Sequence, residues 1–110
     1  MRSYFIDEIS KKDMQKIEEF LKNNAISSPI EGLFWIQIPE QLLTKEQAEH
    51  KECAPHICAL ELGRDWIKLE LFVRSAKSLR CTCCGYCTEE QRDFIISYAN
   101  RMIDQLGVRT

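Results

Sequence analysis

The sequence predicts an α+β fold of two layers, in which an antiparallel β-meander packs with an N-terminal and a C-terminal amphipathic helix. Apolar residues that recur every three or four positions behind a capping signal predict the two helices. Two runs of alternating apolar and polar residues around a glycine turn predict the meander. The chain of 110 residues leaves room for one domain, 1-110, with one core.

The first helix begins at a capping signal near the N-terminus. Ser10 stands three residues before Asp13, a spacing at which the serine hydroxyl caps a helix. Charged residues fill one side of the helix, which is predicted to end at about Asn24. Its apolar stripe consists of Met14, Ile17, Phe20 and Leu21.

The middle of the chain predicts one strand and one short helix. Residues 33–38 are aromatic and β-branched, which is typical of a strand, and Pro39 closes the run. Thr44 and Gln47 then form a second capping box, so a short helix is predicted in the polar stretch 39–51.

A β-hairpin is predicted from two alternating runs, 56–62 and 66–74, that flank Gly63. A third strand, over residues 78–83, is predicted to return beside the second. The expected cross-strand pairs are Leu62 with Ile67, Leu60 with Leu69, and Leu79 with Val73.

The meander sets the expected distance between two of the cysteines. In its register Leu71 lies between Cys58 and Cys81, so these cysteines would be about 10 Å apart across strands that are about 4.8 Å apart. A disulfide requires Cα atoms within about 7 Å. Cys58, Cys81 and Cys83 are therefore expected to be small apolar core residues.

The last helix is predicted by a third capping box, Thr88 to Gln91, and by Gly107 as its C-terminal stop. Its apolar stripe consists of Phe94, Ile95, Tyr98, Met102, Ile103 and Leu106.

Four of the six cysteines gather within residues 81–87, and three interpretations of this cluster compete. The favoured one is structural, with Cys81 and Cys83 in the core and with Cys84 and Cys87 at the junction before the last helix. The second is a zinc or iron–sulfur site made by these four cysteines, because Cys81-x-x-Cys84-x-x-Cys87 reproduces three ligands of a bacterial ferredoxin, although the fourth is missing. The third is thiol redox chemistry at Cys84-x-x-Cys87, just before a helix N-terminus.

A second group of ligand residues precedes the hairpin. His50, Cys53 and His56 suit zinc by residue type, but a helix end and a strand start explain them as well, and that interpretation is favoured. The meander places this group at the opposite end of the sheet from Cys83 and Cys84, about 17–20 Å away. One site is therefore not expected to use both groups.

Net charge and hydropathy limit the classes of partner that the chain is expected to bind. The net charge of −2 argues against binding to nucleic acid, and no apolar run approaches the length of a membrane span. The N-terminal residues turn acidic at once, unlike a secretory signal. Six cysteines in a chain with a full apolar complement indicate reduced thiols and a cytoplasmic protein.

The face of the sheet opposite the core carries aromatic residues. Trp35, Trp66 and Phe72 point to this face by parity. Coverage by the chain's own helices is slightly favoured, and the alternative is an interface for a protein partner or for self-association.

These patterns predict a small non-catalytic interaction or accessory module without a cofactor. A cysteine-based metal site (zinc or iron–sulfur) or a thiol redox function is the alternative. The sequence contains no phosphate-binding glycine loop and no nucleophile or metalloprotease motif, so nothing in it supports an enzyme.

Overall fold

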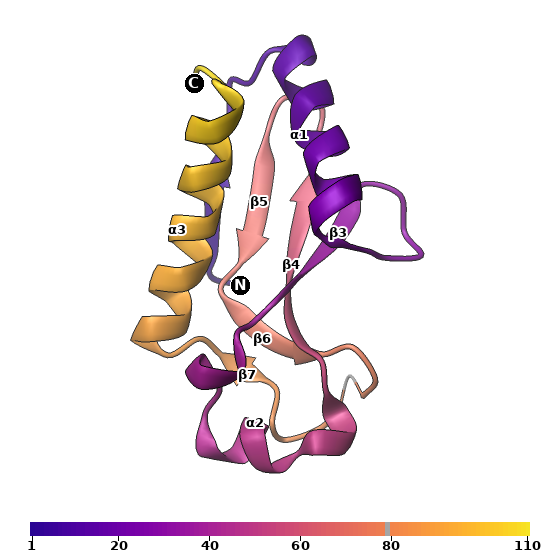
Figure 1. The fold of residues 1–110 in the computed structure, drawn as a ribbon, viewed down its shortest axis with the longest axis vertical. Coiled ribbons are helices and arrows are strands. Elements are labelled where there is room, and N and C mark those ends of the chain that lie inside the picture. Colours follow the sequence, from indigo (N-terminus) through magenta and orange to yellow (C-terminus); the bar gives the residue numbers. More distant parts are fainter. Residues whose placement is uncertain (79) are drawn as a thin grey trace.

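The computed structural model describes residues 1–78 and 80–110, and it confirms the α+β fold with helices packed on an antiparallel sheet (Figure 1). Two short 3-10 turns, Glu40–Leu42 and Lys51–Cys53, flank the middle helix. The helices are α1 (Lys11–Asn24), α2 (Lys45–Glu49) and α3 (Glu89–Leu106). The strands are β1 (Ser3–Ile6), β2 (Ile26–Ser27), β3 (Leu33–Gln37), β4 (His56–Leu62), β5 (Ile67–Glu70), β6 (Phe72–Ser75) and β7 (Gly85–Tyr86).

The sheet has the order β1-β5-β4-β3-β2, and β6 pairs with the start of β4 and with β7. All of these pairings are antiparallel. The sequence patterns did not predict β1, β2 or β7. These strands have two to four residues each, which is too short for an alternating pattern to stand out.

Side-chain caps fix the ends of the helices where the sequence predicts them. Ser10 accepts a hydrogen bond from the backbone N–H of Asp13 at the start of α1. Thr88 and Gln91 form the expected reciprocal box at the start of α3. Gly107 ends α3 with a φ of 67°, a left-handed conformation that favours glycine.

Helices α1 and α3 pack on the same face of the sheet, side by side at one end of the molecule (Figure 1). The core between them and the strands includes Ile17, Leu21, Phe34, Ile36, Cys58, Leu60, Ile67, Leu69, Ile95, Ala99 and Met102. The slightly favoured coverage of the opposite, aromatic face by the chain's own helices is therefore not provided by α1 or α3.

The aromatic side chains on the opposite face are half-buried by local neighbours. Trp66 lies 5.4 Å from Phe5, ring centre to ring centre, and Phe72 lies 5.2 Å from Tyr86. Gly63 is required beneath Trp66, because a Cβ at this position would come within 2.0 Å of the indole ring.

The hairpin register is confirmed between β4 and β5, where Leu62 pairs with Ile67 and Leu60 pairs with Leu69. Three positions further along β4, the register has shifted by two residues, since Ile57 pairs with Arg74. The N–H of Leu71 instead bonds to Arg2, and its carbonyl accepts from Cys87. The predicted row of Cys58, Leu71 and Cys81 is therefore wrong.

The third strand predicted over residues 78–83 is also wrong. The Ser75 hydroxyl accepts hydrogen bonds from the N–H groups of Lys77 and Ser78, which makes a tight turn directly after β6. The chain then loops back towards α2, and only Gly85 and Tyr86 pair with β6. The predicted pairing of Leu79 lies outside the described residues.

The turn creates a small lobe around α2 at the other end of the molecule from α1 (Figure 1). We call residues 39–55, 76–78 and 80–84 the α2 lobe. Among its described residues the buried side chains are Gln47, Cys53 and Cys83. Two of these three are thiols, so the lobe has almost no hydrophobic core of its own.

Candidate metal centre

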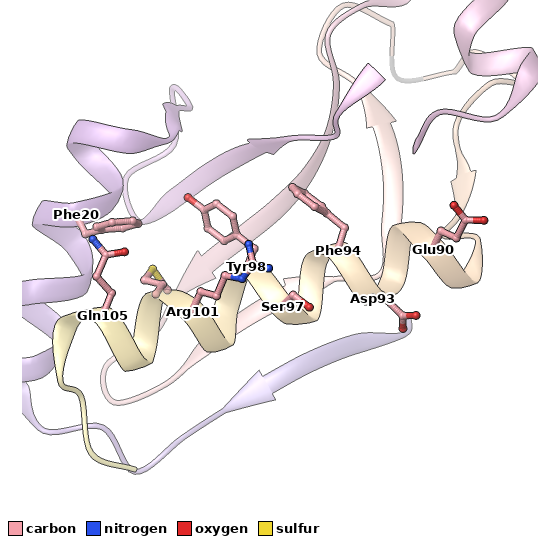
Figure 2. A pocket seen from close by; sticks show the side chains of 9 residues that line it. Phe20, Glu90, Asp93, Phe94, Ser97, Tyr98, Arg101 and Gln105 are labelled. Atoms are coloured by element: carbon pink, nitrogen blue, oxygen red, sulfur yellow. The ribbon is translucent and has the colours of Figure 1, made fainter. Parts of the chain in front are cut away.

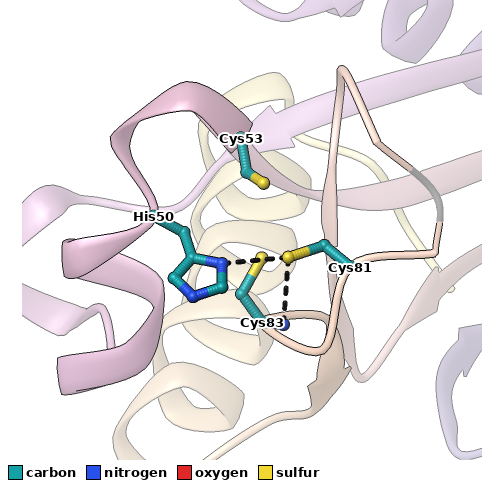
Figure 3. A group of neighbouring side chains, drawn as sticks. All are labelled: His50, Cys53, Cys81 and Cys83. Carbon is teal, nitrogen blue, oxygen red and sulfur yellow. Dashed lines mark hydrogen bonds between the residues drawn. The ribbon is translucent and has the colours of Figure 1, made fainter.

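Four metal-ligating side chains meet in the α2 lobe, as Figure 3 shows: His50, Cys53, Cys81 and Cys83. Their ligand atoms all lie within 4.8 Å of one another. In a tetrahedral site with Zn–S bonds of about 2.3 Å and a Zn–N bond of about 2.0 Å, neighbouring ligand atoms lie about 3.5–3.8 Å apart. Small side-chain movements are therefore enough to place all four atoms around one ion.

Helical geometry brings the first two ligands together. A capping box between Thr44 and Gln47 starts α2, which ends at His50. The N–H of Cys53 then bonds to the carbonyl of His50 at 3.0 Å. Residues three positions apart in a helical turn lie on the same side, so the imidazole and the Cys53 thiol face the same point.

The loop after β6 supplies the other two ligands, and side-chain hydrogen bonds hold it against α2. The Ser75 hydroxyl donates to the carbonyl of Cys53, which ties the end of β6 to the first ligand pair. The Cys84 sulfur accepts from the N–H of Ser75 at 3.3 Å. Thr82 donates to the carboxylate of Glu46 at 2.9 Å. These contacts leave Cys81 and Cys83 pointing into the lobe.

One thiolate of the four-residue group forms without a metal. The backbone N–H of Cys83 donates to the Cys81 sulfur at 3.4 Å, and His50 Nδ1 lies 2.9 Å from the same atom. These hydrogen bonds lower the pKa of Cys81 to about 7, with the Cys83 contacts contributing most. The same contact with Cys81 raises the pKa of His50. Imidazolium and thiolate thus stabilise each other.

The pKa values of the two buried thiols, Cys53 and Cys83, shift in the opposite direction to that of Cys81. Burial raises the pKa of Cys53 and of Cys83, so both stay protonated in the absence of a cation. A divalent metal ion would displace these protons, because the ligand to zinc is the thiolate.

The structure does not bring the remaining cysteines to this point. Cys58 is fully buried in the main core, as predicted. Cys84 lies in the turn before β7 and donates to the carbonyl of Ser78. Cys87 packs against the main core, and burial raises its pKa to about 11. A raised pKa is the reverse of what a redox-active thiol in a Cys-x-x-Cys pair needs.

His56 lies outside the four-residue group although it is only three residues from Cys53. It is 3% exposed, and neither ring nitrogen has a hydrogen-bond partner among the described residues. Burial, followed by the nearby charge of His50, lowers its pKa, so the ring is neutral. Both histidines line a cavity of about 250 Å³ beside α2.

The expectation that the two ligand groups lie at opposite ends of the sheet is wrong. It depended on the third strand, which would have carried Cys83 away from Cys53. The turn at Ser75 reverses that direction and folds residues 80–84 onto α2. The signal in the sequence was two ligand pairs, at positions 50 and 53 and at positions 81 and 83.

A separate groove runs along α3 (Figure 2). Its volume is about 420 Å³, with the aromatic rings of Phe20, Phe94 and Tyr98 on one side. Polar residues line its rim, including Glu90, Asp93 and Arg101. It contains no group of metal ligands among the described residues.

No family model matches the chain, and the comparisons with curated proteins and with solved structures found no match. No helix in the described part of the chain is long and apolar enough to cross a membrane.

Proposed function

We propose that this protein is a zinc-binding module in which His50, Cys53, Cys81 and Cys83 hold one structural Zn²⁺. The observation that carries the proposal is the convergence of four ligand atoms within 4.8 Å from two segments that are distant in sequence. One imidazole and three thiolates form one of the standard ligand sets of structural zinc sites. With four protein ligands, no position is left for a substrate, so the proposed role is non-catalytic.

The make-up of the α2 lobe supports a structural role for the metal. A segment that buries little apolar surface does not hold its fold by the hydrophobic effect, and small domains commonly use a metal instead. In this lobe the buried residues are two thiols and one amide. Zinc would therefore supply the stabilisation that a hydrophobic core supplies elsewhere.

Zinc fits better than the two alternatives that the sequence leaves open. An iron–sulfur cluster spreads its ligands around several iron and sulfide atoms and usually takes four cysteines, whereas here three cysteines and one histidine crowd around one point. The Cys81 thiolate has three further ligand atoms within 4.8 Å of its sulfur, an arrangement that suits four ligands sharing one ion better than a lone nucleophile.

Elemental analysis and cobalt substitution test the proposal. We expect about one zinc per chain in protein purified under reducing conditions, and a cobalt form with the visible absorption of tetrahedral thiolate coordination. Cys83→Ser and His50→Ala should lose the metal. Protein without bound metal in the presence of excess Zn²⁺ would contradict the proposal.

Substitutions of cysteines and histidines outside the four-residue group serve as matched controls, because they show whether metal loss is specific to the proposed ligands. Cys87→Ser and Cys58→Ser remove thiols outside the four-residue group and should keep the metal. His56→Asn should keep it as well, although this histidine belongs to the same sequence cluster as Cys53. Loss of zinc in Cys87→Ser, with retention in Cys83→Ser, would indicate a different ligand set.

An interaction role remains a second proposal, supported by one observation on the outer face of the sheet. Phe5 is 50% exposed where it stacks on Trp66, on the face that neither α1 nor α3 covers. Self-association through this face predicts a dimer in sedimentation experiments that Phe5→Ser weakens. A wild-type chain that stays monomeric at high concentration would contradict self-association.

A further inference from the structure

Two buried glutamines connect the four-residue group to the start of α3. Gln47 is 4% exposed and Gln91 is fully buried, and each also belongs to a capping box. Gln47 Nε2 donates to the carbonyl of Cys83 at 3.1 Å. Gln91 Nε2 donates to Gln47 Oε1 at 2.9 Å and to the carbonyl of Leu42 at 2.9 Å. A continuous path of hydrogen bonds therefore runs from Cys83 to α3.

Capping alone does not account for these two side chains. A capping box needs only an acceptor at this position, which glutamate supplies as well as glutamine. In both boxes the Oε1 atom accepts from the N-cap N–H, of Thr44 and of Thr88. The amide nitrogen takes no part in the capping box and donates hydrogen bonds to other parts of the lobe. A carboxylate has no N–H group and cannot make these bonds. The amide type thus indicates a second role.

We propose that Gln47 and Gln91 are positioning residues of the metal centre, an inference that rests on the proposed zinc site. Gln47 fixes the backbone of Cys83 and thereby the direction of its sulfur. Gln91 holds Gln47 in place from α3. Partners of this kind behind metal ligands change metal affinity by about 10–100-fold when they are removed.

The path also joins the metal to the groove in Figure 2. Glu90, Asp93 and Phe94, in the first two turns of α3, line that groove. Because Gln91 lies in the same turns, metal binding stabilises the N-terminal end of α3 and the groove wall that it carries. Occupation of the metal site therefore regulates the order of a surface some distance along the helix.

Methionine variants test the positioning role, because methionine matches glutamine in shape but has no amide. We expect Gln47→Met to weaken zinc binding about 10–100-fold in competition with a chromophoric chelator. Gln91→Met should weaken it as well, and the double variant should bind like Gln47→Met alone, since both act through Cys83. The cobalt spectrum of Gln47→Met should shift, which a general loss of stability would not cause. Gln15→Met, on the exposed side of α1, is the matched control with unchanged affinity.

Three further measurements keep the test decisive. Ile95→Val, in the core contacted by α3, lowers stability and should leave zinc affinity unchanged. Gln91→Glu keeps the capping acceptor but loses the donor, so it tests the same bond if Gln91→Met does not fold. Zinc should slow amide exchange at residues 89–92 in the wild-type chain and not in the Gln91 variants.

The outcomes separate this inference from the proposed function. If the wild-type chain binds neither zinc nor cobalt, both proposals fail. If it binds zinc and Gln47→Met has the same affinity and cobalt spectrum, only the positioning role fails. If the losses of Gln47→Met and Gln91→Met multiply in the double variant, the two glutamines act independently and the connection to α3 is wrong.

Discussion

Removal of zinc should lower the melting temperature by about 18 °C when free zinc is about 1,000-fold above its dissociation constant. The four ligands come from two segments, and Cys53 and Cys81 are 28 positions apart, so the site is assembled only in the folded chain and unfolding releases the metal. Binding to the folded state alone then stabilises it by about 4.1 kcal/mol. With an unfolding entropy of about 2.1 cal/mol/K per residue for 110 residues, this corresponds to about 18 °C.

Thermal unfolding followed by circular dichroism, with and without a chelator, measures this difference. Cys83→Ser should melt at the same temperature in both conditions, because it has lost the metal already. Cys58→Ser, a thiol in the main core, should melt lower than the wild-type chain and still respond to the chelator. A wild-type melting temperature that does not change with the chelator would refute the reasoning, as would an equal response in Cys83→Ser.

Three further predictions concern the thiols and the core. In the metal-free protein a thiol reagent should modify Cys81 first, since this half-exposed thiol has a pKa of about 7, and it should modify the buried Cys58 last. Zinc should protect Cys81 from the reagent, and mass spectrometry measures the order of modification. Zinc affinity should fall by about 100-fold per pH unit as the pH drops towards 7, because Cys53 and Cys83 each release a proton on binding. It should fall more steeply at lower pH, where His50 and Cys81 are protonated too, and titration across this range tests it. Leu60→Ala should destabilise the chain by about 2–5 kcal/mol in denaturant unfolding while one zinc per chain remains bound.

Local rules predicted most of the elements correctly, because the signals for them lie within a few residues. The capping boxes at Thr44 and Thr88 locate the starts of α2 and α3, and Gly107 locates the end of α3. Strand β4 matches the predicted range 56–62. In each case the sequence contains both the pattern and the residue that ends it.

The errors arose where a distant partner decided the conformation. Leu71 leaves the hairpin because its N–H and carbonyl bond to Arg2 and Cys87, which are far from it in sequence. The alternation around Cys81 and Cys83 resembles a strand, yet the Ser75 hydroxyl turns the chain before a strand can form. Parity arguments assume that a strand continues, and they do not detect a side chain that ends it.

The same limit explains why the sequence predicts the four candidate metal ligands as two separate groups. His50 and Cys53 by themselves resemble a helix end, and Cys81 and Cys83 by themselves resemble core residues. Only the tertiary fold joins the two pairs. The glutamines are a parallel case, since the sequence identifies Gln47 and Gln91 as capping residues but gives no sign that their amides meet.

The position of the proposed ligands relative to the strands allows the α2 lobe to connect the start of β4 with the end of β6. Cys53 lies three residues before β4, and Cys81 lies six residues after β6. Between these points the chain forms β4, β5 and β6, which include the centre of the sheet. The start of β4 and the end of β6 pair through only two positions, His56 with Ser75 and Ile57 with Arg74. Such a short pairing frays readily at its end. A metal bound directly beyond it would hold the two strands together where the backbone ladder is weakest.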